Sequence, residues 1–261
     1  MKKRILYVAF GAGYDQQCCM SAKSLREVTD IPITVITNQS HRQSFEGWSE
    51  VKDVSFKRHP DWPNFINRHP KTMLPNYTDD EWNLYIDTDT YVVPSMREKF
   101  ERSFRYLEKH DVMLLENKFF KCPFQSMHQI RADRFKRFRG IVKKFDLTFP
   151  IPYYSGCVLF FRKSAPAEAF FKMWNKAWRI GCDCMTDQPP LCVAAQKTPN
   201  LKKYTLSGKD WGYGDSRIVT HAKGNHVVKN ILSIKKLYPK PMGKKCLAHP
   251  VIIEANRKDG C

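Results

Sequence analysis

The sequence contains no apolar run that approaches the roughly 20 residues a membrane-spanning helix needs, and it contains no internal repeat and no low-complexity linker. Neither a transmembrane helix nor a repeat architecture is therefore expected. Acidic residues are also few. The chain has 26 Asp and Glu but 44 Lys and Arg, which gives a net charge of +18. Such a surface attracts polyanions, and nucleic acid, an anionic membrane and a phosphate-bearing small substrate all fit this charge.

A regular cysteine framework is missing as well, although the chain has nine cysteines. We therefore expect mostly reduced thiols in a cytoplasmic protein. The basic residues 1–4 and the short apolar stretch after them superficially resemble a signal peptide, but polar residues follow at once, and we interpret this segment as a first buried strand. The alternative is a lumenal fragment, in which disulfides and the glycosylation triplets at Asn38 and Asn76 would matter.

What the sequence does contain is the pattern of one large α/β domain. Its 261 residues, of which 42% are hydrophobic, suffice for a sizeable core. Residues 4–10 and 31–37 predict buried strands, and residues 16–29 predict a helix between them, an order that favours a parallel sheet with a right-handed crossover. Further strands are expected at 51–56, 84–86, 112–116 and 153–161, and further helices at 96–110, 165–180 and from 187 onwards.

The strongest local signal is the acidic triplet Asp87-Thr88-Asp89, which follows the apolar strand residues 84–86. Ligands bind at the carboxyl edge of open α/β sheets, where this triplet would lie. Two carboxylates at positions i and i+2 repel each other unless a cation neutralises them, and their oxygens suit Mg²⁺ or Mn²⁺. The plain alternative is a turn with two solvated aspartates, but apolar residues on both sides make a metal site the better interpretation.

Residues 84–93 (LYIDTDTYVV) resemble the metal-binding segment of GT-A glycosyltransferases, and other segments resemble that fold in the expected order over about residues 4–226. These segments are the opening residues 7–14 and 33–38, the basic Arg68 and Lys71, the strand 154–160, the pair Asp187-Gln188 and the late segment 220–224 (THAKG). The resemblance implies a GT-A, Rossmann-like α/β fold with a mostly parallel central sheet flanked by helices. It also implies transfer of a sugar from a nucleoside diphosphate sugar, most commonly a UDP-sugar, to an acceptor hydroxyl.

The resemblance also implies roles for particular residues. A divalent metal, Mn²⁺ or Mg²⁺, would be held by Asp87, Asp89 and His221. Asp187 would act on the acceptor side, either as a general base or as a group that orients the two substrates. The nucleotide sugar would be contacted by residues from all parts of the chain: Ala9, Phe10, Tyr14, Arg68, Lys71, Asp87, Thr88, Asp89, Gly156, Gln188, Lys223 and Gly224.

Several of these residues have a simpler alternative role. His221 could be an ordinary surface histidine, and Lys223 could be a solvated lysine. Asp187 precedes Gln-Pro-Pro and would suit a helix N-cap. Phe10 could be a core aromatic instead of stacking on a base. Gly156 could be a plain strand glycine instead of a residue that lets a sugar approach the backbone closely.

We expect a single catalytic domain over 1–261, with a nucleotide-binding part at about 1–95, a sugar and acceptor part at about 96–226 and a basic tail at about 227–261. Its partners would be the nucleotide sugar and a glycan, glycoprotein or glycolipid acceptor, with peripheral contact to an anionic membrane as an option. A lumenal catalytic fragment is the alternative to a cytoplasmic enzyme.

Two rival functions stay open at this point. One is a metal-dependent nucleotidyltransferase or phosphohydrolase, which would share the acidic triplet and the basic surroundings. The other is a basic nucleic-acid-binding protein. Residues 118–150 are basic and aromatic but carry no recognised nucleic-acid-binding motif, so we expect no specific nucleic-acid partner.

Overall fold

The structure, a computed structural model, describes residues 1–10, 14–38, 50–54, 67–116, 139–180, 187–211 and 218–221. Its strands are β1 (Lys3–Val8), β2 (Ile33–Thr37), β3 (Glu50–Asp53), β4 (Trp82–Ile86), β5 (Thr90–Val92), β6 (Val112–Glu116), β7 (Tyr154–Arg162), β8 (Lys203–Leu206) and β9 (Val219–His221). Its α-helices are α1 (Tyr14–Arg26), α2 (Arg68–Lys71), α3 (Arg97–Ser103), α6 (Ala165–Ile180), α7 (Gln188–Lys197) and α8 (Gly208–Trp211). Its 3-10 turns are η2 (Leu74–Tyr77), η3 (Pro94–Met96) and η4 (Phe104–Glu108), and residues 139–144 form a further helical segment.

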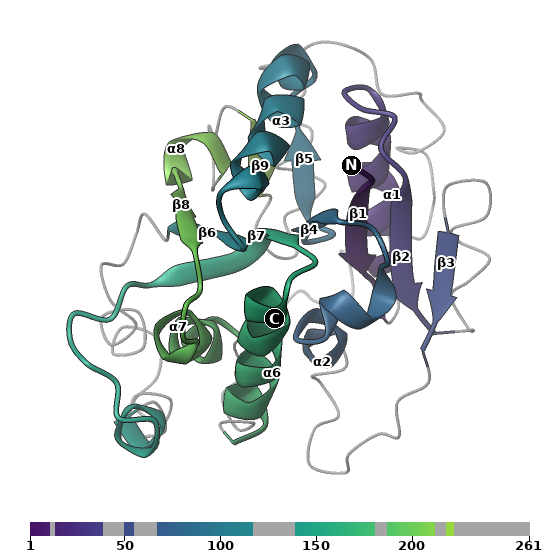
Figure 1. Cartoon of the computed structure of the whole chain (residues 1–261). Coiled ribbons are helices and arrows are strands. Elements are labelled where there is room, and N and C mark those ends of the chain that lie inside the picture. Colours follow the sequence, from purple (N-terminus) through teal and green to yellow (C-terminus); the bar gives the residue numbers. More distant parts are fainter. Residues whose placement is uncertain are drawn as a thin grey trace, which may run out of the picture.

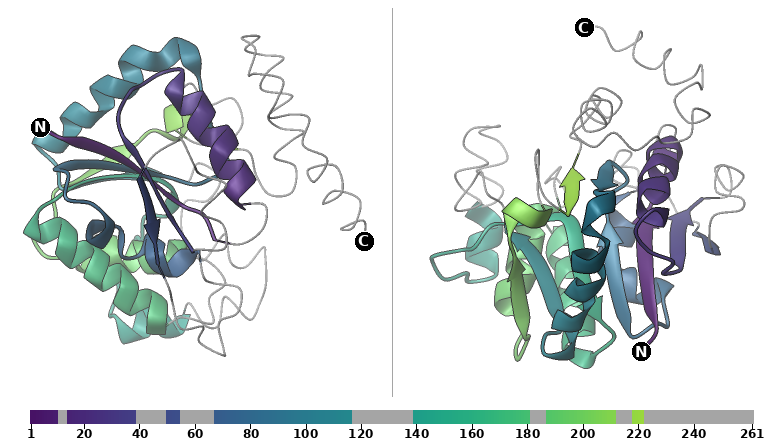
Figure 2. Two further views of the ribbon diagram at one scale, coloured as in Figure 1. Left: turned by 90° about the vertical axis from the view of Figure 1, so that its right-hand side faces the viewer. Right: turned by 90° about the horizontal axis from the view of Figure 1, so that it is seen from above.

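A seven-stranded sheet runs through the middle of the described structure in the order β3-β2-β1-β4-β7-β6-β8. The pairs β3–β2, β2–β1, β1–β4 and β6–β8 are parallel, whereas β7 runs antiparallel to both of its neighbours. A separate ribbon pairs β5 with β9. Helices cover both faces of the large sheet (Figures 1 and 2), so the expected α/β architecture with a mostly parallel central sheet is confirmed.

Two hydrophobic cores fill the spaces between the sheet and its helices. Side chains of a strand point alternately to opposite faces. Ile5 and Tyr7 of β1 therefore pack in the core with α1 and α3, whereas Leu6 and Val8 pack in the core with α6 and α7. The same alternation in β4 sends Tyr85 toward α6, and this orientation of Tyr85 matters for the site described below.

Most predicted elements are confirmed with ends shifted by a few residues, and the helix 165–180 is confirmed in full. The expected continuous helix over 96–110 is wrong, because α3 ends at Ser103 and the 3-10 turn η4 follows it. A 3-10 turn brings side chains three residues apart onto one side. Phe104 and Leu107 are both fully buried there, as is Phe100 of α3, so the buried side of the segment continues past the break.

The described residues also bear on two expectations from the sequence, the absence of a membrane-spanning helix and the reduced state of the cysteines. Among the helices of the described ranges, none combines the length and the hydrophobicity that crossing a bilayer requires. The cysteines Cys18, Cys19, Cys157 and Cys192 form no disulfide within the part of the chain that the structure describes. The basic stretch over 118–138 and the tail at 227–261 lie outside the described residues.

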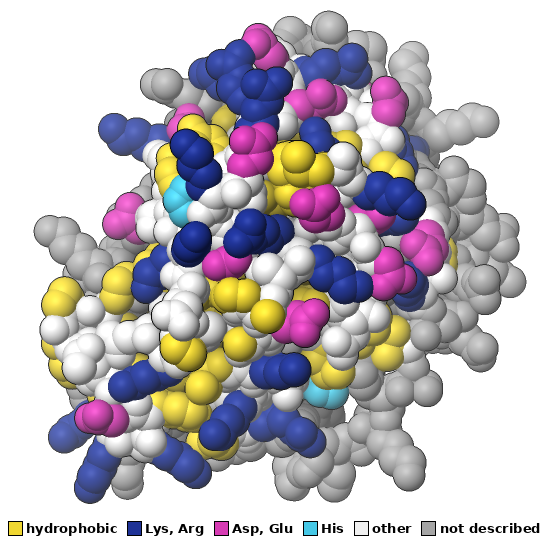
Figure 3. Space-filling view, viewed as in Figure 1, with side chains coloured by type: hydrophobic (Ala, Val, Ile, Leu, Met, Phe, Trp, Pro, Cys, Tyr) yellow, Lys and Arg dark blue, Asp and Glu magenta, His cyan; other side chains and the backbone are white. Residues whose placement is uncertain are grey.

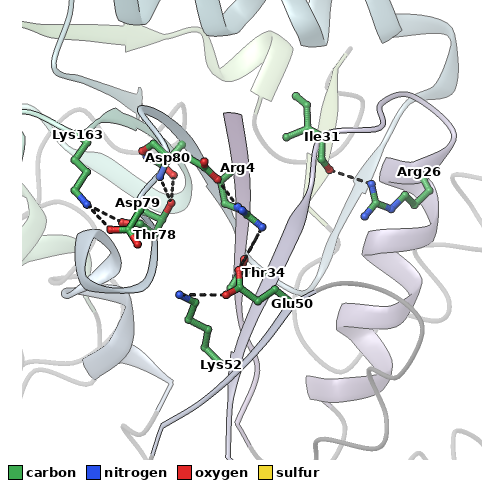
Figure 4. A network of polar contacts seen from close by, with 11 residues as sticks. Arg4, Arg26, Ile31, Thr34, Glu50, Lys52, Thr78, Asp79, Asp80 and Lys163 are labelled. Atoms are coloured by element: carbon green, nitrogen blue, oxygen red, sulfur yellow. Dashed lines mark hydrogen bonds and ion pairs between the residues drawn. The ribbon is translucent and has the colours of Figure 1, made fainter. Parts of the chain in front are cut away.

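The guanidinium of Arg4 joins β1 to β2, β3 and the turn before β4 at the amino edge of the sheet (Figure 4). Arg4 Nε donates a hydrogen bond to Asp80 Oδ2 at 2.6 Å. Arg4 Nη1 donates to Thr34 Oγ1 at 3.3 Å and also lies 3.3 Å from Glu50 Oε2. One side chain thus holds the starts of neighbouring strands in register.

We expect Arg4→Met to lower the free energy of unfolding by about 2 kcal/mol, because the part-buried Asp80 loses a charge-assisted hydrogen bond. Arg102→Met is the matched control, since Arg102 pairs with Glu98 on an exposed helix surface, and it should cost less than about 0.5 kcal/mol. Urea denaturation followed by circular dichroism measures both losses. Equal losses would show that the Arg4 network does not hold the strands together.

Candidate active site

A cavity of about 290 Å³ opens at the carboxyl edge of the sheet, where β1 and β4 end and β7 begins. Open α/β sheets bind their ligands at this edge. Polar and charged side chains from separated parts of the chain meet here. The lining residues are Val8, Tyr14, Asn67, Arg68, Lys71, Tyr85, Asp87, Thr88, Asp89, Gly156, Cys157, Asp187 and Gln188.

Asp87 is held by hydrogen bonds on its backbone and on its side chain. Its backbone N–H donates to the carbonyl oxygen of Cys157 at 2.8 Å, and its carbonyl oxygen accepts from Thr90 Oγ1 at 2.8 Å. Its Oδ1 accepts from the Tyr85 hydroxyl at 2.5 Å and from Lys71 Nζ at 2.9 Å. Burial and, after it, the negative charge of Asp87 keep the pKa of Tyr85 well above its usual value. The phenol therefore stays protonated and donates the hydrogen bond.

Lys71 places a buried ammonium between two carboxylates. It lies in the short helix α2 and is only 5% exposed. Its Nζ is 2.9 Å from Asp87 Oδ1 and 2.7 Å from Asp187 Oδ2. Burial alone would lower the pKa of Lys71, but the charges of Asp187 and Asp87 outweigh burial and raise it above its usual value. Lys71 is therefore an internal cation of the site.

Asp187 occupies the N-cap position of α7, but its side chain makes no capping hydrogen bond. Its backbone carbonyl accepts from Trp174 Nε1 at 3.0 Å and from the Leu191 N–H at 3.1 Å, while the carboxylate turns into the cavity toward Lys71. Burial would raise the pKa of Asp187, but Lys71 and then Arg68 lower it below its usual value. The simpler alternative, a side-chain N-cap, does not describe this residue.

Gly156 makes room for this ion pair. A Cβ atom at position 156 would lie 2.8 Å from Asp187 Oδ2 and 3.2 Å from Lys71 Nζ. Both distances are shorter than ordinary van der Waals contact, and both neighbours are buried. The glycine thus has a packing role at the cavity wall that its place in a strand did not reveal.

Asp89 and Thr88 complete the acidic triplet on the cavity wall. Thr88 Oγ1 donates to Gln17 Oε1 of α1 at 3.2 Å. In the β5–β9 ribbon the backbone of His221 lies opposite Thr90, one residue beyond Asp89. The side chain of His221 is outside the described part of the structure.

The donor set fits a divalent cation only in part within the described residues. Asp87 and Asp89 supply carboxylate oxygens, the ligand type that Mg²⁺ and Mn²⁺ prefer. No group of three or more His, Cys, Asp or Glu side chains within the described ranges comes close enough to hold a metal. The register of β9 places the backbone of the proposed third ligand, His221, opposite Thr90, the residue that follows Asp89.

The remaining site predictions divide into those that line the cavity and those that do not. Tyr14, Arg68 and Gln188 line it together with the residues above. Ala9 and Phe10 are buried in the two cores and do not line it. Their contact with a nucleotide stays a prediction. Lys223 and Gly224 lie outside the described residues.

No role was predicted from the sequence for three residues near the cavity. Tyr85 orients Asp87, and Asn67 bridges the backbone of Phe10, accepting from its N–H at 2.6 Å and donating to its carbonyl oxygen at 2.9 Å. The Tyr153 hydroxyl donates to Gln188 Oε1. Only Tyr85 had a usable signal, because it lies two residues before Asp87 and strand alternation places both on one side.

We expect Gly156→Ala to lower the free energy of unfolding by about 1–3 kcal/mol, because the new methyl group would push the Lys71–Asp187 pair apart. Gly140→Ala is the matched control. Gly140 is exposed in the helical segment 139–144, and a methyl group added there would meet no atom within 4 Å, so Ala should be neutral or stabilise by up to about 1 kcal/mol. Chemical denaturation gives both values. A harmless Gly156→Ala would contradict the tight packing.

The Lys71–Asp187 pair also predicts a pH dependence. The pKa of Asp187 is lowered by folding, so its contribution to stability is complete above the unfolded value of about 4 and is lost as pH falls through the lower folded value. The pKa of Lys71 is raised, so its contribution persists up to about pH 10. Urea midpoints between pH 7 and pH 3 should therefore fall less steeply for Asp187→Asn than for the unsubstituted protein. Parallel curves would argue against the pair.

No model of a known protein family matches the sequence, and no curated protein matches it. Solved structures do match. The galactosyltransferase LgtC, in complex with donor and acceptor sugar analogues, has a TM-score of 0.56 at 15% sequence identity, over 92% of this chain and 98% of that chain.

Two other solved structures also match. Mouse xyloside xylosyltransferase 1 has a TM-score of 0.52 at 11% identity, over 86% of this chain and 99% of that chain. The apo form of the glycosyltransferase GlyE from Streptococcus pneumoniae has a TM-score of 0.52 at 11% identity, over 86% of this chain but 55% of that chain. The chain therefore has the GT-A fold of these glycosyltransferases, as the sequence resemblance implied.

Proposed function

We propose that this chain is a glycosyltransferase that moves a sugar from a nucleoside diphosphate sugar to an acceptor hydroxyl. The observation that carries the proposal is the cavity at the carboxyl edge of the sheet. Within a GT-A fold, it joins the acidic triplet at 87–89, the basic Arg68 and Lys71, and the pair Asp187-Gln188. A basic and acidic lining of this kind suits a ligand that is phosphorylated at one end and hydroxylated at the other.

Asp87 and Asp89, with His221 as the third ligand, would hold Mn²⁺ or Mg²⁺. When bound, such a metal neutralises the charge that develops on the departing diphosphate. The chain's own contribution is to fix the ligand geometry: Tyr85 and Lys71 both bond Asp87 Oδ1, so that the carboxylate keeps one orientation. Preorganised groups of this kind need no rearrangement during the reaction.

The phosphate end of the donor would be met by positive charge. Arg68 lines the cavity beside Asp187 and can bond two phosphate oxygens at once with its guanidinium. Lys223 and Gly224 are proposed to add contacts to the diphosphate. Tyr14, 45% exposed at the start of α1, is the proposed stacking surface for the base. UDP is the first nucleotide to try.

Asp187 is proposed to orient the sugar and the acceptor instead of accepting a proton. Its lowered pKa and its ion pair with Lys71 make it a weak base. A paired carboxylate in a fixed position can still hold sugar hydroxyl groups, and Gln188, held by Tyr153, lies beside it. An orienting role is compatible with retention of the anomeric configuration.

The decisive experiment is a panel of nucleoside diphosphate sugars incubated with the protein and Mn²⁺ while free nucleoside diphosphate is measured. We expect slow release of UDP from one donor, abolished by EDTA and reduced at least about 100-fold in Asp89→Ala. Glu108→Gln is the matched control, because it removes one exposed negative charge in η4 and should leave the rate unchanged.

Other outcomes would favour the rival functions. Release of phosphate or pyrophosphate in place of nucleoside diphosphate would favour a phosphohydrolase or nucleotidyltransferase. Salt-sensitive binding of DNA or RNA that persists in Asp89→Ala would favour a nucleic-acid-binding protein. Absence of release from every donor, together with absence of thermal stabilisation by UDP or GDP with Mn²⁺, would overturn the proposal.

A further inference from the structure

A line of basic side chains runs from the cavity along α2 and onto the outer face of α6. We call it the basic track. Arg68 lines the cavity, and the next residue, His69, lies against α6. The members of the track are Arg68, His69, Lys172, Lys176 and Arg179.

The two helices of the basic track are in direct contact. The rings of His69 and Trp178 stack with their centroids 5.6 Å apart and their planes 18° apart. Asn175 Nδ2 of α6 donates a hydrogen bond to Thr72 Oγ1, the C-cap residue of α2, at 2.6 Å. The track is therefore a continuous surface that begins at the cavity, not two separate basic faces.

The cations on α6 differ from many other cations of the described surface. Lys172, Lys176 and Arg179 are exposed and spaced so that they lie along one side of the helix. Within the described residues, no carboxylate comes within ion-pair distance of any of them. Elsewhere such partners are present, as for Arg102, Lys163 and the residues of Figure 4. In Figure 3, several Lys and Arg side chains lie among hydrophobic and other atoms in the region of α6.

The positive potential also acts on the histidine of the track. Burial, and then the charge of Arg179, lower the pKa of His69. A cation in the last turn of a helix, such as Arg179, is favoured by the helix dipole. The dipole does not account for Lys172, which lies two turns before the end of α6. Charge of one sign along a path into a cavity is a feature suited to a ligand of the opposite charge.

We infer that the acceptor of the proposed transfer is acidic, a glycan bearing carboxylate or phosphate groups that lies along the basic track with its reacting end in the cavity. This inference rests on the proposed function. A glycan is favoured over a membrane because the track is a single line that leads into the cavity at Arg68. Arg179 would pair with carboxylate or phosphate through its guanidinium, and the lysines would act as point charges.

The test uses hexagalacturonate as the carboxylate probe, pentamannose 6-phosphate as the phosphate probe and maltohexaose as the neutral probe. Binding to the full chain is measured by calorimetry at low salt. We expect one or both acidic probes to bind and the neutral probe not to bind. The track variant Lys172→Gln/Lys176→Gln/Arg179→Gln should bind the acidic probe about tenfold more weakly, since three close charges are lost.

A matched control removes the same charge from the other face of the sheet. Lys99→Gln/Arg105→Gln/Lys109→Gln changes exposed residues of α3 and η4 and the residue after η4, and binding should change by less than about twofold. Equal weakening of binding in both variants would show that binding depends on net charge and not on the basic track, and would overturn the inference. So would failure of both acidic probes to bind, or equal binding of the neutral probe.

Two further measurements separate this inference from its alternatives. Track-dependent binding to phosphatidylserine-containing vesicles without binding to either glycan would assign the track to a membrane and overturn the inference. Thermal stabilisation by UDP with Mn²⁺ should be the same in the track variant and the unsubstituted protein. If the unsubstituted protein binds an acidic glycan but no nucleotide or nucleotide sugar, the proposed function fails and the acceptor role fails with it, while the track remains a glycan-binding surface.

Discussion

A single buried ammonium group, that of Lys71, lies between the carboxylates of Asp87 and Asp187 and joins two halves of the cavity. Removing the ammonium would leave two uncompensated carboxylates in a poorly solvated place, which is far more costly than losing an exposed ion pair. The surrounding structure depends on this constraint. Gly156 is small because the pair needs the space, and α2 must stay packed on α6 to keep Lys71 in position.

The alternation of side chains along β4 explains how Asp87 comes to lie beside Lys71. Tyr85 points from β4 toward α6, and Asp87 follows on the same side, where α2 carries Lys71. Because β7 runs antiparallel to β4, its first residues, Gly156 among them, meet the carboxyl end of β4 instead of its start. One reversed strand thus adds a wall to an edge that parallel strands alone would leave open.

Much of the secondary structure could be predicted from the sequence, because it depends on strong local patterns. The strand–triplet signal at 84–89 and the uniform helix at 165–180 depend on neighbours in the chain, and both are confirmed as elements. The pairing of Lys71 with Asp187 depends on residues 116 positions apart that meet only after the sheet and α7 have packed. The bond from Asn67 to the backbone of Phe10 also forms only when distant parts of the chain pack together, and the break of helix 96–110 at Ser103 has no signal in the apolar spacing. The roles of the site residues in binding and catalysis stay predictions.

The Arg4 network lies at the starts of the strands, and the cavity lies at their ends. The sheet therefore separates a network that stabilises the fold from the proposed substrate site. Substitutions at sites more than about 7–10 Å apart and without shared partners usually have additive effects on stability. A lineage of such proteins could therefore explore new donors or acceptors at the carboxyl edge and tolerate the resulting loss of stability by strengthening the amino edge. The length of the strands is what keeps the two groups of side chains apart.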